Sequence, residues 1–188
     1  MSSSSARVVA QGAAEVVAFW RRAGEAGLWF RKDASFDGEF AERFREAHMA
    51  AARRELDGWA DSAEGALALL ILLDQYPRNA FRGTGHMYAT DPLARSIARE
   101  ALAAGHVERV EAPLRLFFCL PFAHSEDLAD QDLSVALYTR LAPEALSHAE
   151  GHRDVVRRFG RFPHRNAMLG RETTAEEAAF LSSGGFAG

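Results

Sequence analysis

Three short segments of the sequence place charged and amide side chains between aromatic residues and prolines. They cover residues 72–83, 117–127 and 158–166. Each lies at the end of an apolar stretch, where the backbone groups of a helix lack intrahelical partners. Charged groups in such surroundings are tolerated only when they are paired and hydrogen-bonded. We therefore expect the site residues to come from these segments: Asp74, Arg78, Asn79, His124, Glu126, Arg161, His164, Arg165 and Asn166.

The charges of two regions are complementary. Residues 153–171 contain six arginines and one acid, whereas residues 124–132 contain four acids and no arginine or lysine. Arginine and carboxylate groups form bidentate pairs with demanding geometry. Two interpretations stay open and can coexist. Either the segments dock on each other and lock the last helices to the body, or some arginines stay unpaired and line an anion-accepting pocket near His124 and His164.

The first functional hypothesis is a binding module. A polar pocket lined by arginine and histidine takes a small anionic ligand or the end of an acidic peptide. Arg161 and Arg165 grip the carboxylate or phosphate, because guanidinium groups make planar two-point contacts. Asn79 and Asn166 orient the ligand, and Glu126 fixes an arginine rather than the ligand.

The second hypothesis is a metal-independent, hydrolase-like enzyme that works by acid–base chemistry. His164 or His124 is the base, Glu126 or Asp74 orients it, and an arginine stabilises an oxyanion. A third hypothesis is an interaction scaffold that recognises a protein through a concave helical face. The residue types alone do not decide whether the chain is an enzyme.

Other residues that could do chemistry have simpler structural interpretations. His148 and His152 stand four apart, as in helical zinc sites, but their apolar neighbours favour histidines partly inside the core. Cys119 is the single cysteine, so we expect an inert thiol and neither a disulfide nor a cysteine zinc site. Ser125 is expected to cap a helix. We therefore expect no metal and no cofactor.

The composition indicates one globular domain. The chain has 188 residues, of which 48% are hydrophobic and 26% charged, and its net charge is -4. This charge gives no attraction to nucleic acid or to an anionic membrane, so neither is expected as a partner. The longest apolar run, 66–73, is far shorter than the ~20 residues that a membrane-spanning helix needs. No targeting segment is recognisable, and we expect a cytoplasmic protein.

The elements that must position the candidate residues are predicted to be helices. Phe36, Phe40 and Phe44 repeat at four-residue steps, a spacing that predicts an apolar stripe on one helix face. The run that begins near Ala63 is apolar nearly all round, which favours a central, buried helix that ends at Pro77. No alternating strand pattern and no Asn-Gly hairpin are present. The chain is therefore predicted to form about seven or eight helices.

Capping residues and helix breakers predict the helix boundaries. The expected boundaries are a cap at Ser62, a start at Asp91–Pro92, a stop at Pro121, a cap at Ser125, a stop at Gly160 and a cap at Thr173 or Thr174. Helices joined by such short connections pack as antiparallel neighbours around one core. We therefore expect an all-α, single-domain bundle of antiparallel helix pairs over 11–188, preceded by a flexible N-terminal tail over 1–10.

Motifs spread over nearly the whole chain form an ordered set. They are WF at 29–30, KD at 32–33, FD at 36–37, LDQYPRN at 73–79, FRGT at 81–84, ATDPL at 89–93, LPFAHSED at 120–127, RFGRFPHRN at 158–166, LGRE at 169–172 and FL at 180–181. This set resembles the bacterial family catalogued as domain of unknown function 924, although that family often has phenylalanine where this chain has Tyr76. The resemblance implies helix pairs similar to tetratricopeptide repeats, with a concave surface. It implies no settled activity, substrate or cofactor, and no catalytic residue can be transferred from it.

Overall fold

Helix α3 (Ala63–Leu70) lies at the centre of the fold because it is apolar on nearly every side. Its Leu67, Leu69 and Leu70 are each at most 1% exposed. The helix packs against α1 (Ser2–Glu25), α5 (Asp91–Ala103) and α6 (Leu116–Ala123). The predicted central position of this helix is confirmed.

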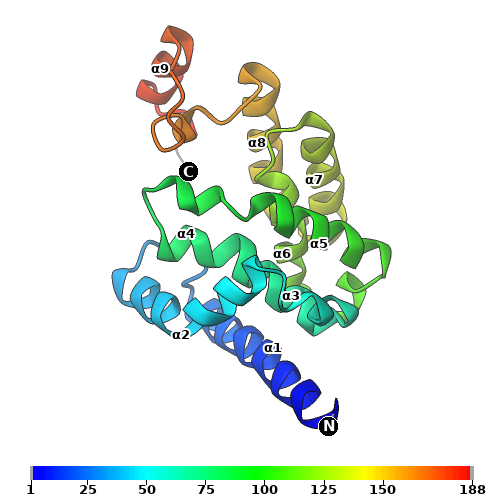
Figure 1. Ribbon diagram of the computed structural model, residues 1–188. Helices are drawn as coiled ribbons and strands as arrows, with labels where there is room; N and C mark the ends of the chain where they lie inside the picture. Colours follow the sequence, from blue (N-terminus) through cyan, green and yellow to red (C-terminus); the bar gives the residue numbers. More distant parts are fainter. Residues whose placement is uncertain (1, 187–188) are drawn as a thin grey trace.

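The computed structural model describes residues 2–186, which contain helices and no strand (Figure 1). The remaining helices are α2 (Ala34–Ala52), α4 (Tyr76–Ala80), α7 (Leu128–Leu141), α8 (Leu146–Phe159) and α9 (Ala175–Ser182). The chain rises from α1 and α2 through α3, α4 and α5 to the last helices, and α9 stands at the end opposite α1 (Figure 1). The all-α fold class is confirmed. The finer expectation of tetratricopeptide-like helix pairs stays a prediction.

An aromatic layer joins α1 and α2. Phe36 and Phe40 stack on Phe19 of α1 with centroid distances of 5.6 and 5.4 Å, and Phe44 meets the same ring edge-on. Trp20 of α1 is fully buried against this layer. The apolar stripe predicted from the four-residue spacing is therefore confirmed.

The sequence predicts that the helix beginning near Ala63 ends at Pro77, but in the structure it continues past Pro77. Ile71–Gln75 form a π-helical turn, η2, and α4 continues from Tyr76 through Pro77. The N–H of Tyr76 donates to the carbonyl of Ile71, five residues earlier. Turns of this kind are rare and frequently occur at functional sites.

Two side chains explain why the helix continues through proline. Pro77 has no N–H, so the carbonyl of Leu73 loses its helical donor. The hydroxyl of Thr90 donates to that carbonyl at 2.5 Å. The preceding carbonyl, of Leu72, accepts from Nδ1 of His48 at 2.8 Å. Donors from outside the helix thus replace the missing backbone bonds, a substitution that residue spacing alone does not reveal.

Pro121 also fails to stop its helix where predicted. Helix α6 includes Pro121 and ends two residues later, at Ala123. The N–H of His124 still donates to the carbonyl of Leu120 at 2.9 Å. The proline therefore removes one bond of the helix and leaves the last turn closed.

Two predicted starts are displaced by one or two residues. Asp127 caps α7, and Ser125 lies upstream of this cap. Thr90 occupies the N-cap position of α5, and Asp91 is its first residue. The carboxylate of Asp91 has a different role, described below.

Other predicted boundaries are confirmed. The Ser62 hydroxyl accepts from the backbone N–H of Gly65 at 3.0 Å. Gly160, with φ of 70°, ends α8 in the left-handed conformation that favours glycine. Thr174 caps α9 through a reciprocal pair of hydrogen bonds with Glu177.

Residues 2–10, expected as a flexible tail, form the first turns of α1. The flexibility of this segment stays a prediction. None of the helices described is long and apolar enough to cross a membrane.

The C-terminal part of the chain returns to the connection between α4 and α5. The turn η7 (Pro163–Arg165) and the residues after it lie near the turn η3 (Gly85–Tyr88). The Tyr88 hydroxyl is 3.9 Å from the sulfur of Met168. A Cβ on Gly85 would lie 2.9 Å from the Met168 carbonyl oxygen, so only glycine permits this approach. The return brings the third polar segment to the first.

Candidate functional site

A buried carboxylate and an imidazole form the centre of the candidate site. Asp74 lies in the π-helical turn and is 1% exposed. Its Oδ1 accepts from Nδ1 of His124 at 2.8 Å, and its Oδ2 accepts from Nε2 of Gln75 at 2.6 Å. His124 follows the last residue of α6, so the pair joins two of the three polar segments. We call Asp74 and His124 the dyad.

Arg78 connects the dyad to α5. It stands one helical turn after Asp74 and donates to the Asp74 backbone carbonyl at 2.6 Å. Its other donors form a bidentate pair with the carboxylate of Asp91, at 2.9 and 3.0 Å. Asp91 therefore holds an arginine rather than beginning a helix as a cap.

Arg165 brings the third segment to the same place. Its Nη2 donates to the backbone carbonyl of His124 at 3.0 Å. Its guanidinium lies 4.5 Å from the ring centroids of both Tyr88 and Phe162, and 3.9 Å from the nearest oxygen of Asp91. Its Nε is buried and has no hydrogen-bond partner in the part of the chain that the structure describes. Burial and the neighbouring Arg78 charge lower the pKa of Arg165.

The surroundings set the protonation states of the dyad. Burial alone would raise the pKa of Asp74, but the charge of Arg78 and the contact with His124 hold it well below its usual range. Burial and the Arg78 charge lower the pKa of His124, despite the opposing effect of Asp74. The dyad is therefore an ionised carboxylate beside a neutral imidazole at pH 7.

These states fix the tautomer of the histidine. An ionised carboxylate can only accept, so the proton of His124 lies on Nδ1 and Nε2 carries a lone pair. Nε2 has no hydrogen-bond partner among residues 2–186, and the side chain is 14% exposed. An imidazole held in this way by a carboxylate is arranged as a general base.

Two further histidines lie near the dyad. The ring of His152 is 6.5 Å from that of His124, and the rings of His152 and His164 both lie 5.6 Å from Phe162. Burial lowers the pKa of both to about 4, and the Arg165 charge contributes at His164. Of the expected site residues, Asp74, Arg78, His124, His164 and Arg165 are thus brought into one neighbourhood.

The remaining expected residues bind other parts of the chain. Glu126 forms a bidentate pair with Arg171, at 2.8 Å for both contacts, and also accepts from the Phe162 N–H. It therefore fixes an arginine, as predicted. Arg161 forms a bidentate pair with Glu177, and Asn166 donates to the same carboxylate at 3.1 Å.

Asn79 belongs to a separate contact. Its amide donates to Oδ1 of Asp37 at 2.7 Å, and Arg82 pairs with the other oxygen of that carboxylate. The structure therefore gives Asn79 a partner at the start of α2 rather than in the neighbourhood of the dyad.

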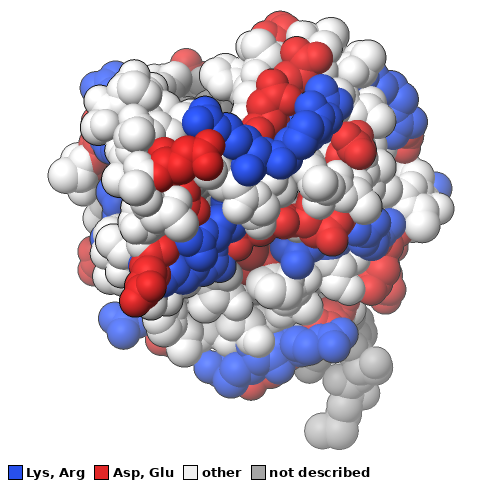
Figure 2. Space-filling model, turned by 90° about the horizontal axis from the view of Figure 1, so that it is seen from above, with Lys and Arg blue, Asp and Glu red and all other residues white. Residues whose placement is uncertain are grey.

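Among the described residues, the unpaired positive charge that the pocket interpretation requires is not found. Asp74 and Asp91 balance Arg78 and Arg165. The other arginines of 153–171 also lie beside carboxylates: Arg153 with Asp132, Arg157 with Asp154, Arg158 with Glu176, Arg161 with Glu177 and Arg171 with Glu126. Figure 2 shows the same relationship on one face, where basic and acidic side chains alternate instead of gathering by sign. The docking interpretation is therefore the one that the ion pairs support.

Several contributors to this neighbourhood are not among the expected site residues. Gln75, Tyr88 and Asp91 all contact members of it, and Phe186 contacts the two further histidines. Asp91 was interpreted as a helix start because Asp-Pro is a common start signal. The pairing with Arg78 depends on the π-helical turn, for which the sequence gives no signal.

The histidine pair His148 and His152 was the candidate for a helical zinc site. His152 is half-buried, but His148 is exposed, so the expectation that both lie partly inside is wrong for His148. The carbonyl of His148 accepts from the ring of His152 because the two stand one turn apart.

Cys119 is fully buried, and burial raises the pKa of its thiol to about 12. Among the described residues, no three histidine, cysteine or acidic side chains are placed to hold a metal ion.

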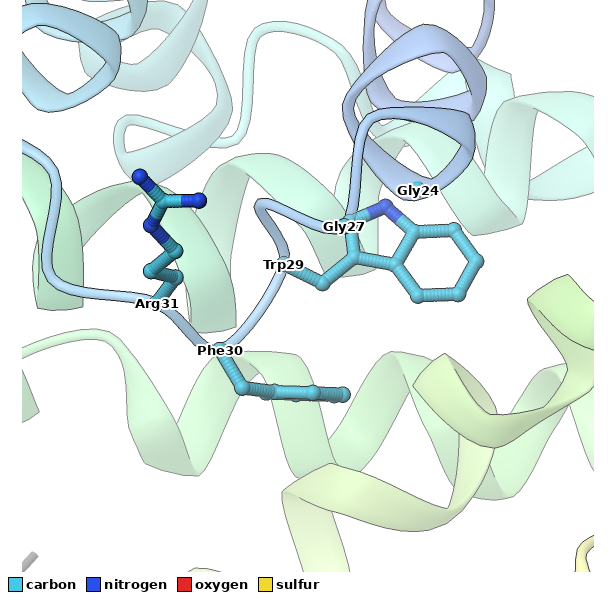
Figure 3. Close-up of a pocket in the computed structure, with 5 residues that line it drawn as sticks. All are labelled: Gly24, Gly27, Trp29, Phe30 and Arg31. Atoms are coloured by element: carbon cyan, nitrogen blue, oxygen red, sulfur yellow. The ribbon is translucent and has the colours of Figure 1, made fainter.

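An open hollow of about 390 Å³ lies after α1 (Figure 3). Trp29, Phe30 and Arg31 line it together with two glycines, and none of them belongs to the expected site. Gly24 has no room for a side chain, since a Cβ there would lie 2.2 Å from the indole of Trp29. The indole packs under the end of α1 and donates to the Trp20 carbonyl at 2.7 Å. The hollow is therefore the open space beside the packed indole of Trp29.

Comparisons with known proteins agree with the resemblance seen in the sequence. A family model described as "Bacterial protein of unknown function (DUF924)" matches residues 16–185. The solved structure of a protein of unknown function, ATU0120 from Agrobacterium tumefaciens, is 59% identical, with a TM-score of 0.90 over 93% of this chain and 98% of that one. A search of curated proteins finds no match. Because the family model covers most of its length, the chain belongs to the DUF924 family of bacterial proteins of unknown function.

Proposed function

We propose that the chain is a metal-independent hydrolase in which His124, oriented by Asp74, is the general base. The main observation that supports this proposal is the 2.8 Å contact between the two side chains. The contact holds the proton on Nδ1 and leaves the lone pair of Nε2 for a substrate. A second argument is that Asp74 lies in a π-helical turn, a feature frequent at functional sites.

The proposed reaction is attack of water on an ester or amide carbonyl. Nε2 of His124 takes a proton from water while the water oxygen bonds to the carbonyl carbon, and the carbonyl π electrons move to its oxygen. The tetrahedral species then expels the leaving group, which takes the proton back from His124. Asp74 stabilises the transient imidazolium, and Arg165 supplies positive charge beside the oxyanion.

Activity measurements test the proposal. Purified protein is assayed against carboxylic esters, amides and phosphate esters, and His124→Gln is compared with wild type. The expected result is turnover of an ester or amide that falls by about 10²- to 10⁴-fold in the variant. His148→Gln is the matched control, since this histidine is exposed, and it should retain full activity. No turnover by wild type, or equal turnover by His124→Gln, contradicts the proposal.

Binding of a small anion or acidic peptide end is the second candidate function. It is favoured by Arg165, whose Nε has no partner among the described residues and whose nearest carboxylate oxygen is 3.9 Å away. The balanced charges make this candidate weaker than the first, since an incoming anion must compete with Asp91. Wild type and Arg165→Gln are compared by thermal shift with acetate, phosphate and a C-terminal acidic peptide. A thermal shift in wild type alone supports anion binding, and no shift with any anion contradicts it. Arg158→Ala, which breaks an exposed ion pair, is the control.

A further inference from the structure

The side chain of Phe186 lies on a group of rings beside the dyad. Its ring centroid is 4.5 Å from His152, 5.0 Å from His164 and 6.1 Å from Phe162. We call these three residues the aromatic seat. Phe186 itself remains 37% exposed. The ring therefore covers the seat from outside rather than filling a closed core.

Two glycines direct Phe186 onto the seat. Gly184 has a φ of 84°, a conformation that residues with a side chain rarely adopt. The N–H of Gly185 donates to the carbonyl of Phe180 at 2.9 Å, and a Cβ on Gly185 would lie 2.6 Å from the Phe180 ring. The chain can therefore turn back sharply after α9 only because both positions are glycine. The placement of Phe186 follows from this turn.

The seat adjoins both functional groups of the proposed centre. His152 of the seat lies 6.5 Å from the His124 ring. Phe162 of the seat carries the Arg165 guanidinium at 4.5 Å from its ring centroid. A group that replaced Phe186 would thus be separated from His124 by the His152 ring and from the Arg165 guanidinium by the Phe162 ring.

The chemistry of the seat favours an uncharged aromatic group. His152 and His164 each have a pKa of about 4, so both rings are neutral at pH 7. Neutral aromatic rings prefer edge-to-face and offset contacts with another ring. The Phe186 ring makes contacts of this kind with both histidines, at interplanar angles of 61° and 84°.

We infer that the aromatic seat is the aryl-binding subsite of the His124 centre and that Phe186 occupies it as an intramolecular competitor. This inference rests on the proposed function and names its substrate class: esters or amides of arylalkanoic acids. The aryl group of the substrate takes the place of Phe186, and its carbonyl carbon faces Nε2 of His124. Release of Phe186 from the seat precedes binding.

A binding experiment that does not depend on catalysis tests the subsite. The probe is 3-phenylpropan-1-ol, which has an aryl group and no hydrolysable bond, and 1-propanol is the matched probe without a ring. Phe186→Ala should bind the aryl probe about tenfold more tightly than wild type, because the competitor is gone. The histidine ring resonances of His152 and His164 should shift with saturation, and 1-propanol should leave them unchanged. Equal affinity in both proteins, or no shift of these resonances in Phe186→Ala, overturns the inference.

A second variant guards against a non-specific effect of losing an exposed phenylalanine. Phe30 is 67% exposed and lines the hollow after α1. Phe30→Ala should bind the aryl probe like wild type. A gain in affinity of the same size in Phe30→Ala would contradict a specific competition by Phe186.

A kinetic comparison separates failure of this inference from failure of the proposed function. Ethyl 3-phenylpropanoate and ethyl propanoate are assayed with wild type and Phe186→Ala. The expected result is a rise in kcat/KM of about tenfold in the variant for the aryl ester alone. Aryl binding without hydrolysis of either ester supports the subsite and contradicts the catalysis. Hydrolysis of both esters with equal kcat/KM supports the catalysis and overturns the subsite.

Discussion

The Nδ1 atom of His124 lies 2.8 Å from Oδ1 of Asp74, although 50 positions separate the two residues in the sequence. The contact requires the π-helical turn that places Asp74 and the end of α6 that places His124. Arg78 lies against the same carboxylate. One buried carboxylate is therefore shared between a permanent cation and a neutral imidazole.

The two neighbours of His124 should move its pKa in opposite directions. Asp74 raises the pKa of this histidine and Arg78 lowers it, while burial lowers it further. Asp74→Asn should therefore lower the pKa of His124 relative to wild type, and Arg78→Met should raise it. NMR titration of the His124 ring measures both. Shifts of the same sign in the two variants would contradict the arrangement described.

Removal of the Asp91 carboxylate should destabilise the fold strongly. Asp91→Asn leaves the buried Arg78 without its bidentate partner and Arg165 without its nearest acid. Loss of one partner from a buried ion pair typically costs about 3–5 kcal/mol. Urea unfolding measures the free energy. Arg53→Ala, which breaks the exposed pair with Glu55, is the control and should cause no measurable loss; equal effects of the two changes would contradict the role of Asp91.

The π-helical turn should depend on the hydroxyl of Thr90. Thr90→Val keeps the shape of the side chain but removes the donor to the Leu73 carbonyl, which Pro77 cannot replace. An unsatisfied buried carbonyl costs about 1–3 kcal/mol. Thr139→Val is the matched control, because that hydroxyl donates to a helix carbonyl at an exposed position. Urea unfolding measures both losses of stability, and equal losses would show that the Thr90 hydroxyl does not replace the donor missing at Pro77.

Acid should destabilise the chain through His152 and His164 before most carboxylates titrate. Both have a pKa of about 4 in the folded chain, and an unfolded histidine titrates near 6.5. Between these values the unfolded state binds more protons. The two neutral histidines therefore contribute fully to the free energy of unfolding above about pH 6.5. This contribution is lost as the pH falls toward about 4, at up to about 1.4 kcal/mol per pH unit for each ring.

The variant His152→Phe isolates one of these contributions. Phenylalanine keeps an aromatic ring on Phe162 and Phe186 but cannot be protonated. The unfolding free energy of the variant should fall less steeply than that of wild type between pH 6.5 and 4.5. Equal slopes for the two proteins would show that His152 does not titrate differently on folding.

Much of the fold follows from local sequence signals. The stripe of Phe36, Phe40 and Phe44 and the caps at Ser62 and Thr174 depend on spacing within a few residues, and the structure confirms them. The end predicted at Pro77 failed because the donor that rescues this helix, Thr90, comes from another element. A single sequence does not show such long-range compensation.

The site was predictable to the level of segments and no further. Residue types correctly indicated that Asp74, His124 and Arg165 share one place, since charged groups at apolar helix ends need partners. They did not indicate that Asp91 would neutralise the arginines, because Asp91 has a sufficient local interpretation as a helix start. The role of Phe186 depends on the path of the chain after α9 and had no local signal at all.

The proposed function requires His124 to be a neutral base with its proton on Nδ1. Nitrogen-15 NMR of the histidine rings at pH 7 measures this state directly. We predict a protonated, pyrrole-type Nδ1 and an unprotonated, pyridine-type Nε2 for His124. A proton on Nε2, or an imidazolium with protons on both nitrogens, would contradict it.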